Sequence, residues 1–260
     1  MATVALNEFI LKMILYQIFW FGQWIIILLV FKDMKRVDHD TKNRLVSIVH
    51  GLGSLIFSII DLFVYKPSFQ TMNSNFENNA LIFSISYFVY DTIGCYLIDM
   101  ADRDLVMHHV VTLVGLSSCL YYGMGGPYCY FGVFLTEISN FPMHVRKILE
   151  NIGLRHTILF EYLESAYFAL YSVARGLLGP IAIYIAIANW NYTPKAIMLV
   201  SALIVFQSCT FIKTMMEIVR LKIGAKKERD AKGVQLWWFH VNPKVHEMEY
   251  IKNYEHKKIF

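Results

Sequence analysis

The sequence predicts an all-α membrane protein with seven transmembrane helices, on the basis of its composition, segment lengths and charge placement. Hydrophobic residues make up 56% of the 260 residues and charged residues only 17%, which is more apolar than a soluble domain usually is. The apolar runs also reach about 20 residues, the length that a helix needs to cross the hydrocarbon core. This composition excludes an ordinary soluble globular domain.

Seven apolar segments follow one another along the chain. The predicted helices cover residues 9–31, 45–65, 80–99, 105–122, 128–150, 157–188 and 195–221. Pro142 is expected to bend or restart the fifth helix, and a Gly- and Pro-containing stretch at 176–180 to kink the later half of the sixth. These segments divide the chain into an N-terminal helix with a basic loop (1–39), a membrane domain (40–222) and a polar C-terminal tail (223–260).

The placement of positive charge predicts the orientation of the bundle, because Lys and Arg accumulate on the cytoplasmic side of a membrane. With seven helices, the first, third and fifth loops and the C-terminal tail share one face. Together these segments carry at least fifteen Lys and Arg, whereas the loops of the opposite face carry only Lys66 and Lys195. The count predicts an N-terminus outside and a tail on the cytoplasmic or matrix side.

Polar side chains within the apolar segments are the candidates for a functional site, since such groups are costly in a membrane. Helical periodicity places several of them on shared faces. The second helix carries His50 and Asp61, the third Tyr87 and Asp91, the fourth His108 and Thr112, the fifth adds Glu137 and Asn140, and the sixth carries Glu164 and Arg175. Polar groups also join membrane helices, and a buried Arg175 needs a carboxylate such as Glu137 or Glu164.

We predict no metal site at the adjacent histidines. Neighbouring residues on an α-helix point about 100° apart, so His108 and His109 cannot easily chelate one ion. One ring is expected to face a cavity while the other packs against a neighbouring helix. All four cysteines fall in apolar segments without a CxxC spacing, which is typical of packing residues rather than of a disulfide framework.

Several motifs in one order resemble the TLC-domain family, the membrane fold of ceramide synthases and TRAM proteins. The matching pieces are RLVSIVH at 44–50, YFVYD at 87–91, HHVVT at 108–112 and TEISN at 136–140. The resemblance covers roughly residues 40–222. It implies that helices 2–7 form a TLC-type six-helix barrel around a hydrophobic cavity, with helix 1 as an addition.

The resemblance also implies which residues would carry out a reaction, if the protein catalyses one. Ceramide synthases use a histidine pair, matched here by His108 and His109, to move an acyl group from coenzyme A to a sphingoid amine. Their longer motif continues to a His-Asp-x-Ser-Asp element, where this chain has Thr136 in place of the histidine and Asn140 in place of the second acid. Asn cannot support an imidazolium as a carboxylate does, so the chain is placed nearer the non-synthase branch.

No residue is assigned a catalytic role on this basis, although His108, His109, Asp91 and Glu137 are the candidates. The wall of the expected lipid cavity takes in a larger set. Its members are Tyr87, Asp91, His108, His109, Thr112, Glu137, Asn140, Glu164 and Arg175.

Three functions remain open at this stage. The first is a lipid-binding or lipid-regulating membrane protein without ceramide synthase activity. The second is a structural subunit of a large membrane complex, for example in the mitochondrial inner membrane. The third is an N-acyltransferase, and only this one requires a cofactor, acyl-CoA. The expected partners are membrane lipids and proteins that order the C-terminal tail; nucleic acid is not among them.

The last residues of the sequence predict in which cellular membrane the protein resides. Lys257 and Lys258 stand fourth and third from the end of the sequence, which resembles a dilysine retrieval signal, an address that is recognised on the cytoplasmic face. This pattern predicts residence in the endoplasmic reticulum, with the mitochondrial inner membrane as the alternative.

Overall fold

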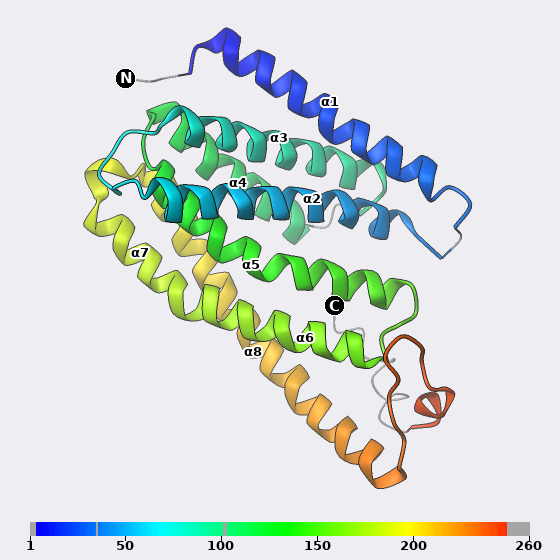
Figure 1. The fold of residues 1–260 in the computed structure, drawn as a ribbon. Helices are drawn as coiled ribbons and strands as arrows, with labels where there is room; N and C mark the ends of the chain where they lie inside the picture. Colours follow the sequence, from blue (N-terminus) through cyan, green and yellow to red (C-terminus); the bar gives the residue numbers. More distant parts are fainter. Residues whose placement is uncertain (1–3, 35, 101–102, 249–260) are drawn as a thin grey trace.

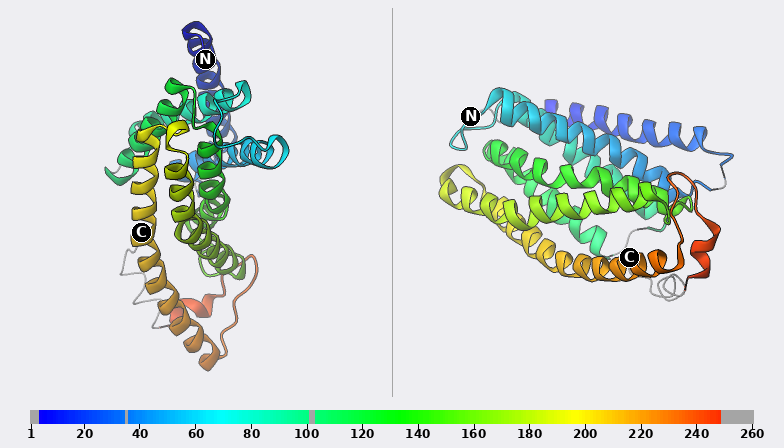
Figure 2. Two further views of the ribbon diagram at one scale, coloured as in Figure 1. Left: turned by 90° about the vertical axis from the view of Figure 1, so that its left-hand side faces the viewer. Right: turned by 60° about the horizontal axis from the view of Figure 1, so that its bottom comes forward.

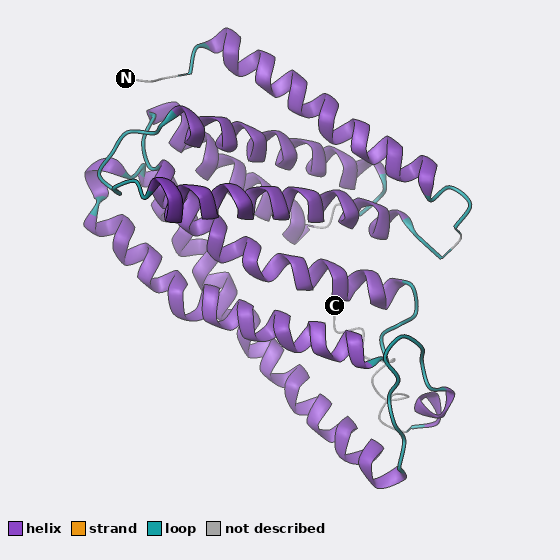
Figure 3. Cartoon of the chain, viewed as in Figure 1, coloured by secondary structure: helices purple, strands orange, loops and turns teal. Residues whose placement is uncertain are grey.

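Helices make up nearly all of the protein in this computed structural model, which describes residues 4–34, 36–100 and 103–248. No strand occurs in those ranges (Figure 3). The all-α fold class predicted from the sequence is therefore confirmed.

Seven long helical segments run back and forth in antiparallel order (Figure 1). They are α1 (Leu6–Val30), α2 (His39–Ile59) with its π-helical end η1 (Ile60–Tyr65), α3 (Asn75–Leu97), α4 (Arg103–Tyr122), α5 (Gly126–Asn151), the sixth segment made of α6 (Ile158–Tyr171), the π-helical η2 (Ser172–Leu177) and α7 (Leu178–Ala188), and α8 (Lys195–Lys232). Two short 3-10 turns follow α7 and α8, η3 (Trp190–Tyr192) and η4 (Pro243–Glu247).

Six of these segments are long and apolar enough to cross a membrane, counted over the described residues. The seventh, α5, has 26 residues and so reaches the required length, but it also carries Glu137, Arg146 and Lys147. It packs mainly against α2 and α6, so its polar side chains lie within the bundle. The fold is thus consistent with seven spans.

The ends and breaks of some helices differ from those that the sequence predicts. Pro142 lies inside an uninterrupted α5, so the expected restart at this residue was wrong; membrane helices tolerate proline when neighbouring helices enclose it. The sixth segment changes to π-helical winding in η2, which overlaps the predicted stretch 176–180 at its first two residues. The last helix continues to Lys232 rather than ending near 221, because its polar end is stabilised by ion pairs such as Arg229–Glu161, 2.9 Å apart.

The loops with the most positive charge lie together at one end of the bundle. The α1–α2 loop, the α5–α6 loop and the segment after α8 are at the right of Figure 1, and the α2–α3 and α7–α8 loops at the left. The segment after α8 returns to this end, where the Ile158 N–H donates to the Trp237 carbonyl over 3.0 Å. Val245 and Met248 pack against Val234 in a small core of their own. The chain itself therefore holds the tail as far as Met248.

Helix α1 lies on the outside of the other helices, against α3 (Figures 1 and 2). Its anchor is Trp20, which is fully buried and donates from Nε1 to Ser86 Oγ over 3.0 Å. Apolar residues on its other face, such as Ile18 and Leu29, are largely exposed. This pattern fits a helix with one face on protein and the other in lipid.

Candidate functional site

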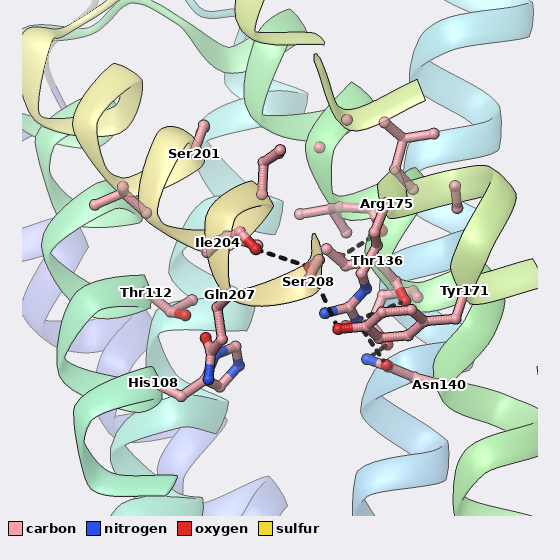
Figure 4. A pocket seen from close by; sticks show the side chains of 18 of the residues that line it. His108, Thr112, Thr136, Asn140, Tyr171, Arg175, Ser201, Ile204, Gln207 and Ser208 are labelled. Carbon is pink, nitrogen blue, oxygen red and sulfur yellow. Dashed lines mark hydrogen bonds between the residues drawn. The ribbon is translucent and has the colours of Figure 1, made fainter. Parts of the chain in front are cut away.

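A cavity of about 760 Å³ lies inside the bundle. Its lining residues come from α2 to α8, and among the described residues none comes from α1. Much of the wall is apolar. Representative apolar residues are Leu116, Leu135, Ala182, Ile197, Val200, Ile204 and Phe211. Polar side chains gather around Arg175, as Figure 4 shows. The cavity thus has an apolar part and a polar part.

Eight of the nine residues expected on the cavity wall are found there. They are Tyr87, Asp91, His108, His109, Thr112, Glu137, Asn140 and Arg175. They come from four different segments, α3, α4, α5 and η2. The structure therefore brings together groups that lie far apart in the sequence.

His109 on α4 is held by α3 through both of its ring nitrogens. Nε2 lies 3.3 Å from Asp91 Oδ2, and Nδ1 lies 2.9 Å from the Thr92 hydroxyl. That hydroxyl donates its single hydrogen to the Phe88 carbonyl over 2.6 Å, so it accepts from Nδ1–H. Nε2 faces the Asp91 carboxylate, so protein groups contact both ring nitrogens and fix the orientation of the ring.

The other oxygen of Asp91 extends the network to α2. Asn43 Nδ2 donates to Asp91 Oδ1 over 2.7 Å, and the Tyr90 hydroxyl donates to Asn43 Oδ1 over 3.1 Å. Asn43, Tyr90, Asp91 and His109 are all buried. Because buried polar groups are stable only when they are hydrogen-bonded, this network ties α2, α3 and α4 together behind the cavity wall.

His108 differs from its neighbour. It projects into the cavity (Figure 4), and its ring centroid is 6.0 Å from that of His109. Within the described part of the chain its ring has no hydrogen-bond partner. The two adjacent histidines thus have separate environments, as the 100° step of an α-helix requires: His109 is fixed by protein, and His108 is available to a ligand.

Asn140 links a cation to a carboxylate at the polar part of the cavity. Its Nδ2 donates to Glu137 Oε2 over 3.0 Å, and its Oδ1 accepts from Arg175 Nη2 over 3.0 Å. The same Nη2 donates to the Thr136 carbonyl over 3.2 Å, and the guanidinium lies 4.7 Å from the centre of the Tyr171 ring. Arg175 Nε is buried without a partner among the described residues. The acceptors of Arg175 are therefore neutral.

The expected pairing of Arg175 with Glu137 or Glu164 was wrong, and Glu164 does not line the cavity. Glu164 is buried on α6, where Arg146 Nη1 lies 2.7 Å away and Lys222 of α8 also contacts the carboxylate. The π-helical η2 includes more residues per turn than an α-helix. Periodicity counted in α-helical turns therefore fails between Glu164 and Arg175.

His50 and Asp61, expected on one face of the second helix, also separate. His50 lines the cavity, stacks on Tyr87 with ring centroids 3.8 Å apart, and contacts Ser54 Oγ over 3.0 Å. Asp61 lies in η1, beyond the α-helical part, and lines a different pocket together with Glu77. Eleven residues of helix correspond to about 16 Å along its axis, so a shared face does not bring His50 and Asp61 into one cavity.

The sequence patterns did not predict some residues of the cavity wall. Arg44 and His144 line the cavity but lie near the helix ends, where polar residues are common. On α8, Ser201, Gln207, Ser208 and Thr214 line it as well. Their spacing of about seven residues is a helical signal that a search of the last helix for a polar face would find. No group of three or more His, Cys, Asp or Glu is arranged for a metal ion in the described ranges.

Comparison with known proteins decides the family. The model of the TLC domain matches residues 40–219, which is most of the chain and nearly the whole predicted membrane domain. The chain belongs to the TLC domain family. This confirms the resemblance drawn from the four motifs, each of which falls inside the matched range.

A known relative belongs to the same family. A TLC domain-containing protein from Arabidopsis thaliana is 26% identical over 162 residues, which cover 59% of this chain and 63% of the relative. The match thus spans less than two thirds of that relative's length. No solved structure matches the chain.

Proposed function

We propose that this TLC domain protein binds an amphipathic membrane lipid inside the bundle, with the polar head at Arg175 and His108. The observation behind this proposal is a cavity of about 760 Å³, within the range of about 300–1,000 Å³ typical of ligand sites. Its apolar wall, which includes Ile204 and Phe211, suits an acyl chain. Its polar part offers a cation and a free imidazole.

The hydrogen bonds of Arg175 favour an anionic head group. The guanidinium donates to an amide and a carbonyl, and no ion pair of the described residues includes it. Its Nε has no partner. Because guanidinium binds phosphate and carboxylate in a two-pronged geometry, a phosphate- or carboxylate-bearing lipid is the ligand class that satisfies Arg175 best.

The test is to identify lipids that remain with the purified protein. The full chain is purified in mild detergent, and the retained lipids are extracted and identified by mass spectrometry. We expect an anionic lipid at roughly one per protein, lost in Arg175→Gln. Arg103→Gln, an exposed arginine at the start of α4, serves as the matched control and should retain it. Equal lipid content in both variants contradicts the proposal.

A second candidate is N-acyl transfer, because His108 presents a ring without a partner to the cavity beside the His109–Asp91 pair. The position that carries an acid in the resembled synthases is Asn140, which is engaged by Glu137 and Arg175. We therefore expect no acylation of a sphingoid base when the protein is supplied with acyl-CoA. Turnover that disappears in both His108→Ala and His109→Ala would favour this second function over lipid binding alone.

We infer residence in the endoplasmic reticulum from Lys257 and Lys258, which lie outside the described residues. The signal requires a cytoplasmic tail, which the charge distribution predicts. Replacing both lysines with Ser should move a tagged protein to the Golgi or the cell surface. A mitochondrial pattern that the replacement leaves unchanged would favour the inner membrane and a role in a complex there.

A further inference from the structure

A second pocket lies at the opposite end of the bundle from the basic loops. It has a volume of about 360 Å³ and lies between η1, the α2–α3 loop and the start of α3. Its lining residues are Asp61, Tyr65, Pro67, Thr71, Met72, Ser74, Phe76 and Glu77. Tyr65 and Met72 are exposed, so the pocket opens to the surface. None of these residues belongs to the lipid cavity described above.

Two buried carboxylates line this pocket, and among the described residues each has one oxygen without a hydrogen-bond partner. Asp61 and Glu77 are each 1% exposed. Asp61 Oδ2 and Glu77 Oε1 have no hydrogen-bond partner in the described part of the chain, and no ion pair formed by those residues reaches either group. A buried charge without a partner costs several kcal/mol, so two at one place require an explanation.

The capping contacts of α3 hold the side chain of Glu77 in position. It closes the capping box of α3, in which Ser74 N donates to Oε2 and Ser74 Oγ accepts from Glu77 N. The positive end of the helix dipole stabilises a negative charge at this position. The capping contacts use Oε2 and leave Oε1 free.

The neighbours of Glu77 hold its carboxylate in place. The backbone of Gly126 packs closely against it, since a Cβ on Gly126 would lie 2.8 Å from Glu77 Oε1. Asn73 fixes Gly126 in turn, because Asn73 Oδ1 accepts from the Gly126 N–H over 2.7 Å while its Nδ2 donates to Asn78 Oδ1 and to the Cys119 carbonyl, each over 3.0 Å. The Glu77 carboxylate is therefore positioned before any ligand binds.

We propose that Asp61 and Glu77 bind a Ca²⁺ ion at the outer end of the bundle. The lining supplies carboxylate and hydroxyl oxygens, from Thr71 and Ser74 among others, and contains neither histidine nor cysteine. Such a set selects hard cations, and Ca²⁺ completes six to eight oxygen ligands with carbonyls and water. Mg²⁺ requires a stricter octahedron and is dehydrated less readily. The ion joins the end of α2 to the start of α3.

The first test is a cation titration of the full chain in detergent after treatment with a chelator. Ca²⁺ should raise the melting temperature, and Mg²⁺ at the same concentration should raise it less. Asp61→Asn and Glu77→Gln should each weaken the Ca²⁺ response by about tenfold or more in concentration. Asp33→Asn, an exposed acid in the α1–α2 loop, removes the same charge and should leave the response intact.

A second measurement does not depend on the stability of those variants. Tb³⁺ replaces Ca²⁺ and emits when excited through a nearby aromatic ring, and Tyr65 lines the pocket. Emission that Ca²⁺ displaces and that falls in Tyr65→Phe supports the proposal. If neither Ca²⁺ nor Tb³⁺ at millimolar concentration has an effect, or if the effect persists in Asp61→Asn, the proposal is overturned. Stabilisation by acid alone, without a cation response, overturns it as well and assigns the site to a proton.

Discussion

The side-chain amide of Asn140 donates a hydrogen bond to Glu137 Oε2 over 3.0 Å. Its oxygen at the same time accepts from Arg175 Nη2 over 3.0 Å. A carboxylate at this position could not do both, because it has no hydrogen to donate, and an apolar side chain has neither group. Position 140 therefore separates a half-buried cation from a buried carboxylate instead of adding a second acid.

Substitutions at Asn140 should produce a graded loss. Asn140→Leu leaves Glu137 and Arg175 without their shared partner and should cost about 2–3 kcal/mol of stability, whereas Asn140→Asp keeps the acceptor for Arg175 and should cost less. Because the introduced carboxylate would neutralise the guanidinium, Asn140→Asp should also reduce the retention of an anionic lipid. Thermal unfolding and lipid analysis measure both effects, with Asn191→Asp, a change of an exposed residue in η3, as the control. A Leu variant as stable as the wild type contradicts this description.

Gly51 should tolerate no side chain, because α2 passes close to Glu137 at this residue. A Cβ there would lie 2.8 Å from Glu137 Oε2, the atom that accepts from Asn140. Gly51→Ala must displace the carboxylate, and we expect a loss of about 1–2 kcal/mol. The matched control is Gly22→Ala on α1, which meets no atom within 4 Å and should be neutral or stabilising by up to about 1 kcal/mol. Equal melting temperatures for the two variants would show that the close approach of α2 to the Glu137 carboxylate at Gly51 has no effect on stability.

The two neighbouring histidines should respond differently to removal. His109→Ala leaves Asp91 Oδ2 without its partner and should cost about 1–3 kcal/mol. His108→Ala breaks no hydrogen bond within the described residues, so we expect a smaller change in melting temperature together with a loss of bound lipid. Each variant is purified in the same detergent, so both properties come from one preparation. The reverse pattern would exchange the structural and ligand-facing roles of the two rings.

Docking of the C-terminal segment should weaken in acid. Burial lowers the pKa of His156 in the α5–α6 loop from 6.5 to about 4. Arg155, His246 and Arg229 act on this pKa in the same direction, and Glu150 acts against them. The unfolded loop therefore binds more protons than the folded one between these values, so the docked state is fully stable above about pH 6.5 and loses stability as the pH falls toward 4.

The amide of Ile158, which donates to the Trp237 carbonyl, reports this docking. Its hydrogen exchange, corrected for the intrinsic effect of pH, should accelerate across that interval in the wild type. His156→Gln should flatten the dependence, and the exposed His240→Gln should not. Acceleration that persists in His156→Gln would assign the pH effect to another group.

Much of the fold follows from the sequence because hydrophobic runs and charge placement are determined by the membrane itself. Length and composition alone identify six of the seven spans. The remaining helix, α5, is more polar than the apolar stretches of the other six, but the sequence predicted it as well, at residues 128–150. Helix ends were less predictable, since the end of α8 depends on ion pairs such as Arg229–Glu161 between segments far apart in the chain.

The candidate site was predictable only where helices keep the regular α-helical spacing. Asp91 and His108 were placed on the cavity side by simple periodicity. The π-helical η2 breaks that spacing and accounts for the misplacement of Glu164. Asp61 is separated from His50 by about 16 Å along the helix, a distance that a count of shared faces does not include. Which acceptors Arg175 contacts depends on side-chain geometry across α5, which no pattern within one helix contains.

Photoaffinity labelling of α8 tests the central claim, a lipid held inside the bundle, most directly. Ile204 and Phe211 line the cavity, whereas Leu199 and Phe206 on the same helix are 63% and 70% exposed on the outer surface. An anionic lipid with a diazirine in its acyl chain is bound to the protein in detergent, and the modified residues are identified by mass spectrometry. We predict labels at Ile204 and Phe211 that excess unmodified lipid suppresses and Arg175→Gln removes. Labels confined to Leu199, Phe206 and the outer face of α1 would contradict the account.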